Sequence, residues 1–216
     1  MHVLAQHEQA AGTRIVDLPN YDADILGAPF KVILVNGVTE VIGSDGQVKV
    51  KVPNLSGLVR AVIKSRVLHP RKLQGADIRF IRRGLGLKAK TLAKQLDVTP
   101  EHFSRCEGAT KTLSGSSEKI FRLLAFMASS CPDPEAVLEA AHNKKGEDQK
   151  ERADPSLIYS SVAESWRDVF NLFVSMDILP IYGIGDELCF EFVICREPRN
   201  DHLNDDNVEW CKNLAA

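Results

Sequence analysis

The sequence predicts a mostly α-helical protein with small β elements. Three observations lead to this fold class. They are β-branched runs and turn dipeptides in the first quarter, apolar residues at helical spacing through the middle, and a short helix-and-strand pattern near the end. The 216 residues are enough to bury a core in one large domain or two small ones. Hydrophobic residues make up 44% and charged residues 26%, which is typical of globular proteins and argues against global disorder.

The first quarter predicts a small antiparallel β-meander. Residues 30–35 (FKVILV) form an apolar run, and Asn36-Gly37 directly after it favours a tight type I′ hairpin with residues 38–42 as the return strand. Asp45-Gly46 is a second turn signal, and residues 47–52 (QVKVKV) alternate as a strand whose lysines face water. We expect a helix to follow over residues 55–67, capped by Asn54 and ended by His69-Pro70. Its apolar face consists of Leu58, Val62 and Ile63.

Residues 73–108 have the pattern of two short helices joined by a tight turn. Such helices cross at a large angle and need small or branched apolar residues at the crossing. The inner face of the first helix consists of Leu92, Ala93 and Leu96, and the turn consists of Asp97, Val98 and Thr99. Thr99 suits the N-cap of the second helix and Pro100 its first position. Phe103 should then point inward, and the outer side chains are Glu101, His102, Ser104 and Arg105.

Flanking helices are expected to close a five-helix core around this pair. The preceding helix contributes Ile78, Phe80, Ile81 and Leu85, and the following one contributes Ile120, Leu123, Leu124 and Met127. Residues 131–155 read as a shorter helix over 134–141 and a charged linker.

A small α+β module is expected at residues 156–216. An amphipathic helix over residues 155–175 presents an apolar stripe, which forms either core or a dimer or partner contact; the stripe contains Trp166, Phe170 and Phe173. Residues 178–182 and 188–194 are expected strands, and the pattern allows a last short helix around residues 207–214.

Charge is unevenly distributed along the chain. The formal net charge is −2, but residues 60–125 contain 15 Lys and Arg against 5 Asp and Glu, a net charge of +10. Residues 126–216 carry a net charge of −10. A basic third beside acidic neighbours is the electrostatic footprint of a DNA-contacting module, although basic helices can also simply be well solvated.

No catalytic or metal-binding motif is found. There is no glycine-rich phosphate loop, H-E-x-x-H or nucleophile elbow, and the histidines are scattered. We therefore expect no enzyme activity, no cofactor, no metal and, without a long apolar run, no membrane segment. Five cysteines without C-x-x-C spacing are expected to be thiols in a reducing cytoplasm; they are Cys106, Cys131, Cys189, Cys195 and Cys211.

The central stretch resembles the helix-turn-helix of the lambda-repressor-like (XRE) family. The matching positions are Arg82, Leu85-Gly86-Leu87, Leu92-Ala93, Leu96, Val98-Thr99-Pro100-Glu101, Phe103-Ser104-Arg105 and Glu107. The resemblance implies a DNA-binding domain at residues 71–130. The sequence departs from the family at Cys106, at Gly108 and at Lys88-Ala89, where a Ser/Thr cap and a phosphate-binding Gln are usual.

Residues 21–127 also resemble antitoxin regulators of the MqsA kind. Their N-terminal zinc domain carries paired C-x-x-C motifs, whereas this chain has no cysteine before Cys106. The resemblance therefore implies at most the fold of that domain, over residues 1–70, with its metal lost.

The outer face of the second helix is expected to read bases in the major groove. Arg105 is the main candidate, because a guanidinium binds guanine O6 and N7 together, and an ion pair with Glu101 or Glu107 is the alternative. Phosphate contacts are expected from the basic residues around the pair, with Arg82 or Arg83 as further candidates. The full set of DNA-binding candidates is Lys88, Lys90, Thr91, Thr99, Glu101, His102, Ser104, Arg105 and Lys111.

Together these features predict a sequence-specific transcriptional regulator in the cytoplasm, associated with the nucleoid. It would act as a homodimeric repressor on an inverted-repeat, double-stranded DNA operator. The alternative is an antitoxin that neutralises a partner toxin by direct binding and autoregulates its operon.

Overall fold

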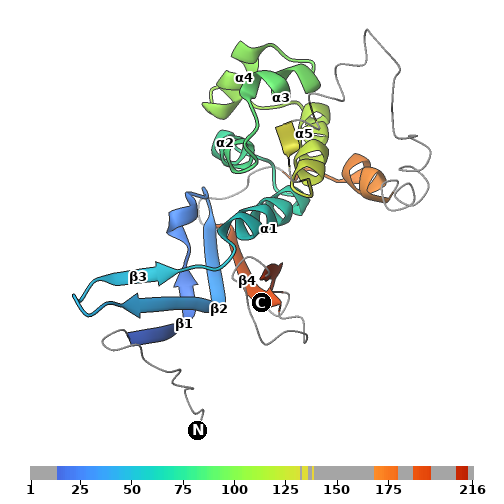
Figure 1. Ribbon diagram of the computed structural model, residues 1–216. Helices are drawn as coiled ribbons and strands as arrows, with labels where there is room; N and C mark the ends of the chain where they lie inside the picture. Colours follow the sequence, from blue (N-terminus) through green and yellow to red (C-terminus); the bar gives the residue numbers. More distant parts are fainter. Residues whose placement is uncertain are drawn as a thin grey trace, which may run out of the picture. The chain divides into compact units, whose positions relative to one another are not determined.

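The protein is described by a computed structural model over residues 14–131, 133–135, 138, 168–179, 187–195 and 208–213. These residues combine helices with a five-stranded mixed sheet (Figure 1). The chain forms two compact units, one of residues 1–62 and 187–216 and the other of residues 63–186. The first unit holds the sheet, and the second holds most of the helices.

The sheet is organised around one long strand, β2. Its strands are β1 (Arg14–Asp22), β2 (Lys31–Ile42), β3 (Val48–Lys51), β4 (Cys189–Cys195) and β5 (Glu209–Lys212), with the short 3-10 helix η1 (Asp24–Leu26) after β1. β1 and β3 pair with β2 in antiparallel fashion, β4 pairs with it in parallel, and β5 pairs with β4. The core of this unit includes Val32, Leu34, Val38, Phe190, Phe192 and Trp210.

The prediction of a hairpin at Asn36-Gly37 is wrong. Both residues have the positive φ of a type I′ turn, 63° and 81°, yet the chain continues as β2. The β1–β2 register shifts opposite this point, between Leu18 and Asn20. The dipeptide therefore forms an irregularity within one strand. Before it, residues 31–35 of β2 pair with β4, and after it, residues 39–42 pair with β3. The turn at Asp45-Gly46 is confirmed, and it connects β2 to β3.

The C-terminal strands complete this sheet instead of forming a separate module. β4 lies beside β2, with Phe190 opposite Val32, and confirms the strand expected over residues 188–194. The helix expected around residues 207–214 is wrong, because β5 occupies this place. Trp210 of β5 donates its indole N–H to the carbonyl of Pro53 at 2.8 Å, so side-chain bonds also tie this strand to its unit.

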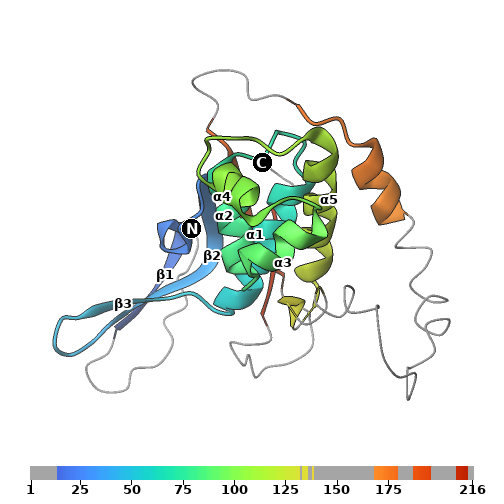
Figure 2. The same cartoon turned by 90° about the horizontal axis from the view of Figure 1, so that it is seen from above.

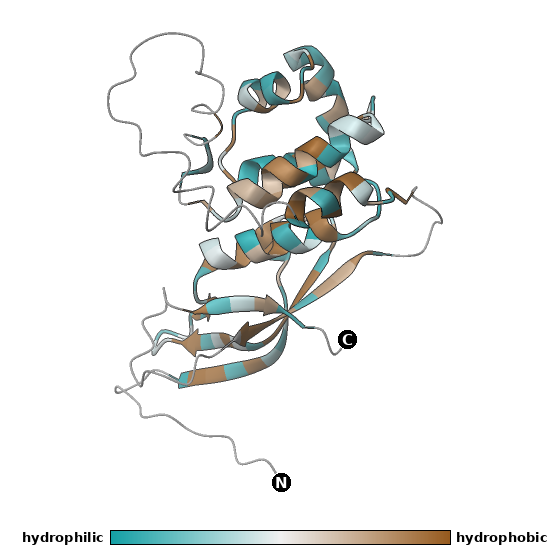
Figure 3. Ribbon diagram, turned by 90° about the vertical axis from the view of Figure 1, so that its right-hand side faces the viewer, coloured by the Kyte–Doolittle hydropathy of each residue, from teal (hydrophilic) through white to brown (hydrophobic). Residues whose placement is uncertain are grey.

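The helical unit follows the expected order of helices. Its elements are the end of α1 (Leu55–Leu68), α2 (Gly75–Gly84), α3 (Ala89–Gln95), α4 (Pro100–Glu107) and α5 (Gly115–Ala128), and residues 168–175 are also helical. Asn54 caps α1 as expected, because its side-chain oxygen accepts the N–H of Gly57 at 2.9 Å. The inner faces of α2, α3 and α4 are buried as predicted. Figure 3 shows hydrophobic and hydrophilic residues alternating along the helices.

The buried face of helix α5 differs from the predicted one. Ile120, expected inside, is 45% exposed, whereas Phe121, Arg122 and Ala125 are buried. The inner face of α5 therefore includes a charged side chain, which an apolar pattern cannot show.

The helix at residues 168–175 packs on α5. Phe173 is buried, and its ring centroid lies 5.7 Å from that of Phe126. Phe173 is thus core, while Phe170 of the same predicted stripe is 52% exposed. Trp166 lies outside the described residues, as do residues 1–13 and the linker expected over residues 143–155.

Among the cysteines, Cys211 is disulfide-bonded, which corrects the expectation of five thiols. Cys106, Cys131 and Cys189 form no disulfide bond. Over the described ranges, no group of His, Cys, Asp and Glu has a metal-binding arrangement, and no helix has the length and hydrophobicity needed to cross a bilayer.

Candidate nucleic-acid interface

Helices α3 and α4 form a tight corner at one end of the helical unit (Figures 1 and 2). Asp97 in the turn has a φ of 54°, and the N–H of Val98 donates to the carbonyl of Ala93 at 3.0 Å. Ala93 is 1% exposed, so a larger side chain has no room at the crossing. The hydroxyl oxygen of Thr99 accepts the N–H of His102 at 3.1 Å, which confirms the predicted N-cap of α4.

The inner face of α4 is held by apolar packing and by a very close approach of α2. Phe103 and Cys106 are fully buried, and burial raises the pKa of the Cys106 thiol. Gly75 begins α2 directly against the end of α4. A Cβ atom on Gly75 would lie 2.5 Å from the carbonyl oxygen of Cys106 and 2.7 Å from that of Glu107. In the sequence, the only sign of this contact is a glycine at the start of a helix.

An ion pair with α2 also holds the C-terminal end of α4 in place. Arg82 of α2 donates from Nε to Oε1 of Glu107 at 2.7 Å and from Nη2 to Oε2 at 3.2 Å. Arg82 also donates to the carbonyl of Leu87, just before α3. One guanidinium thus connects α2, α4 and the approach to α3. Arg82 is therefore a positioning residue, and its expected role as a phosphate contact is not supported.

The outer face of α4 is open to solvent. Glu101, Ser104 and Arg105 are exposed, and His102 is partly exposed. The guanidinium of Arg105 makes no hydrogen bond or ion pair with any residue in the described parts of the chain, and Glu107 pairs with Arg82 instead. The alternative of an ion pair between Arg105 and Glu101 or Glu107 is therefore not observed.

The loop after α4 is folded back onto this helix. The backbone N–H groups of Thr110 and Lys111 donate to the carbonyl of Arg105 at 3.1 and 3.2 Å, and the Thr110 hydroxyl donates to it at 3.1 Å. The side chain of Lys111 is exposed, and its backbone is hydrogen-bonded to that of Arg105, the residue that is expected to read bases.

No family model, curated protein or solved structure matches this chain. The exposed charge around α3 and α4 is therefore the main indication of a ligand. Apart from Arg105, the exposed basic residues on the two helices and their flanking loops are Lys88, Lys90, Lys94 and Lys111.

Two of the expected phosphate contacts are engaged by an acidic side chain. Glu135 accepts the backbone N–H of Lys88 at 2.9 Å and the hydroxyl of Thr91 at 2.6 Å. The Lys88 ammonium also lies 3.5 Å from the carboxylate. Burial opposes the charge of Glu135, but the hydrogen bonds from Thr91 and Lys88 outweigh it, so the pKa of this carboxyl lies below its ordinary value.

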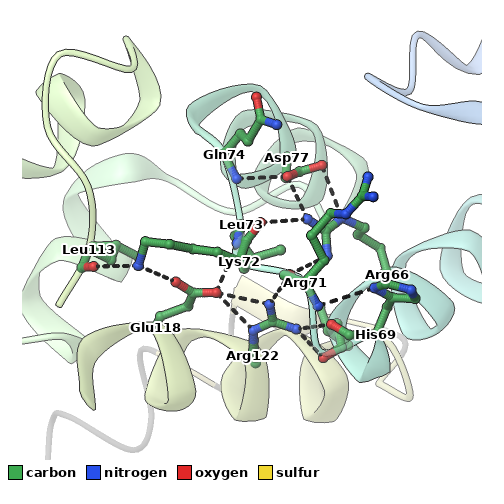
Figure 4. Close-up of polar contacts among 11 residues, drawn as sticks. Arg66, His69, Arg71, Lys72, Leu73, Gln74, Asp77, Leu113, Glu118 and Arg122 are labelled. Atoms are coloured by element: carbon green, nitrogen blue, oxygen red, sulfur yellow. Dashed lines mark hydrogen bonds and ion pairs between the residues drawn. The ribbon is translucent and has the colours of Figure 1, made fainter. Parts of the chain in front are cut away.

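A buried ionic cluster supports the other side of α2 (Figure 4). The Arg122 cluster, as we call it, consists of Arg66, Lys72, Asp77, Glu118 and Arg122. Arg122 donates to the carbonyls of Val67, His69 and Arg71 at 2.6–2.8 Å and to Glu118. Burial lowers the pKa of its guanidinium.

This cluster holds the connection from α1 to α2 in place. Arg66 pairs with Asp77 at 2.7 Å, and Asp77 also accepts the N–H of Gln74 as part of a capping box. Arg66 and Arg122 belong to the basic third of the sequence, but both are almost fully buried and are not available to a ligand. Some of the basic residues therefore stabilise the fold from inside, and only the exposed ones are available to a ligand.

Proposed function

We propose that this chain is a sequence-specific DNA-binding protein that regulates transcription by inserting α4 into the major groove. The observation that carries the proposal is the exposure of the Arg105 side chain. Its side chain is exposed and without a partner among the described residues, on a helix whose inner face is fixed by Phe103, Gly75 and the Arg82–Glu107 pair.

The dimensions and chemistry of α4 suit this role. An α-helix with its side chains is about 10–12 Å across, so α4 can enter the major groove of B-DNA, which is about 12 Å wide. The Arg105 guanidinium can donate two parallel hydrogen bonds to O6 and N7 of a guanine. Ser104 and His102 can donate to or accept from neighbouring bases, and Glu101 can accept from a cytosine amino group. A helix with a fixed inner face, and with a guanidinium that has no partner among the described residues, is preorganised for such readout.

Affinity in this proposal comes from the surrounding lysines. Lys90 and Lys111 are exposed and can neutralise phosphates on either side of the groove, with release of counterions. Lys94 is an additional exposed cation on α3. Binding should therefore weaken steeply with added salt.

A homodimer on an inverted repeat is part of the proposal, because one module of this size buries too little DNA surface for tight binding. The two half-sites would then be separated by about 34 Å, one turn of the double helix. Deleting the C-terminal segment is an unsuitable test of dimerisation, because it would remove β4 and the buried Phe173. Sedimentation of the full chain with and without DNA measures the stoichiometry directly.

The proposal is tested by selection of binding sites from random duplex DNA at two salt concentrations. The full chain should enrich a short motif, and its affinity should fall with salt. Lys90→Ala should enrich the same motif with a salt slope reduced by about one. Failure of the folded chain to retain any duplex, or retention without enrichment, would overturn the proposal.

A further inference from the structure

The residues that begin α3 are bound by a carboxylate from another part of the same unit. Glu135 is 47 residues beyond Lys88 in the chain and 44 beyond Thr91. Both of its oxygens are used, Oε2 by the Lys88 backbone N–H and Oε1 by the Thr91 hydroxyl. The Lys88 side chain, 69% exposed, also lies against it at 3.5 Å.

A second contact holds the same segment along α3. The side-chain amide of Gln95, at the end of α3, donates to the carbonyl of Leu138 at 2.8 Å. Leu138 is itself buried. Glu135 therefore contacts the start of α3 and Leu138 contacts its end. The position of the carboxylate depends on these hydrogen bonds as well as on its charge.

The atoms bound by Glu135 belong to Lys88 and Thr91, which the sequence predicts as contacts to the DNA backbone. A phosphodiester presents two non-bridging oxygens that share a negative charge, and a carboxylate presents the same number of oxygens and the same charge. The Lys88 N–H and the Thr91 hydroxyl each have a single proton, which cannot be donated fully to both anions at once. The retained carboxylate also repels an approaching phosphate.

We propose that Glu135 is an autoinhibitory residue that occupies a phosphate-contacting position of the DNA-binding surface. This inference rests on the proposed function. DNA binding through Lys88 and Thr91 requires the Glu135 carboxylate to leave, so the contact lowers affinity for all sequences alike. Whatever displaces Glu135 from Lys88 and Thr91 raises that affinity.

The test compares Glu135→Gln and Glu135→Ala with the unaltered chain on a random-sequence duplex over a range of salt concentrations. Gln keeps the shape and one of the two acceptor oxygens but removes the charge, and Ala removes the contact. Asp177→Asn serves as the control, because it removes one exposed carboxylate without touching Lys88 or Thr91. Thermal unfolding confirms that each variant is folded.

Both Glu135 variants should bind the duplex several-fold more tightly than the unaltered chain. The Ala variant should also show a salt slope steeper by about one, since one further phosphate is neutralised. Asp177→Asn should bind like the unaltered chain. Equal or weaker binding by folded Glu135 variants would overturn the inference while leaving the proposed function standing. Absence of DNA binding by the unaltered chain, the control and both variants would instead overturn the proposed function, and this inference with it.

Discussion

Arg82 of α2 and Glu107 of α4 form a two-pronged ion pair with donor–acceptor distances of 2.7 and 3.2 Å. Only 17% of the Arg82 side chain and 10% of the Glu107 side chain are exposed. The pair joins the helix that supports the corner to the last residue of the helix that is proposed to read DNA.

Removal of one partner of this pair should destabilise the domain. Arg82→Met leaves the Glu107 carboxylate uncompensated in a mostly buried place, and we expect a loss of roughly 3 kcal/mol in the free energy of unfolding. Urea denaturation measures this loss. Arg83→Met, at the exposed neighbouring position, should change the free energy by much less. The double variant Arg82→Met/Glu107→Leu should be more stable than Arg82→Met alone, and a simple sum of two losses would contradict the coupling.

The close contact of α2 with α4 predicts a sharp difference between two glycines. Gly75 and Gly115 each occupy the first position of a helix. Gly75→Ala places a methyl group against backbone atoms of α4 and should cost roughly 1–3 kcal/mol of unfolding free energy. A Cβ on Gly115 meets nothing within 4 Å, so Gly115→Ala should be neutral or slightly stabilising. Similar melting temperatures for the two variants would refute the close approach.

The Arg122 cluster predicts a large loss of stability when the buried, charged side chain of Arg122 is removed. Arg122→Leu removes the donors to three backbone carbonyls and leaves Glu118 with Lys72 as its remaining charged partner. We expect a loss of about 3–5 kcal/mol, measured by urea denaturation. Lys94→Leu, an exposed position on α3, is the control and should have little effect. A near-neutral Arg122→Leu would mean that this loop does not depend on the guanidinium.

The low pKa of Glu135 predicts how its contribution to stability changes with pH. A carboxyl with a lower pKa in the folded chain than in the unfolded chain stabilises the fold above its ordinary pKa. That contribution is lost as the pH falls through the folded value. Glu135→Gln should therefore be less stable than the unaltered chain by roughly 1 kcal/mol near neutral pH, and the difference should disappear in acid. Unfolding curves at a series of pH values measure it, and a difference that grows in acid would contradict the assigned direction.

Local sequence patterns predicted the helical unit well. Thr99 and Pro100 mark the start of α4, and apolar residues at helical spacing identify the buried faces of α2, α3 and α4. These features depend on neighbours within one or two turns, which the sequence displays directly. The exposure of Arg105 follows from the same periodicity.

The features that sequence patterns missed depend on distant partners. The positive φ values expected of Asn36 and Gly37 are present, but the direction of the chain after them is set by pairing with β1 and β4. The pairing of β2 with a strand more than 150 residues away leaves no local pattern. Arg122 and Glu118 are four residues apart on α5, and their charges alone do not show that backbone carbonyls surround Arg122. The contact of Glu135 with Thr91 was missed for the same reason.

The most direct measurement of the central claim is the binding of Arg105 variants to the selected site and to the same site with single base pairs changed. Arg105→Ala should lose roughly 1–3 kcal/mol per half-site on the selected sequence and almost nothing on random duplex. It should also cease to discriminate at one guanine position, and Arg105→Lys should recover only part of that discrimination. An equal loss of affinity on selected and random DNA, with discrimination unchanged at every base pair, would contradict base reading by α4.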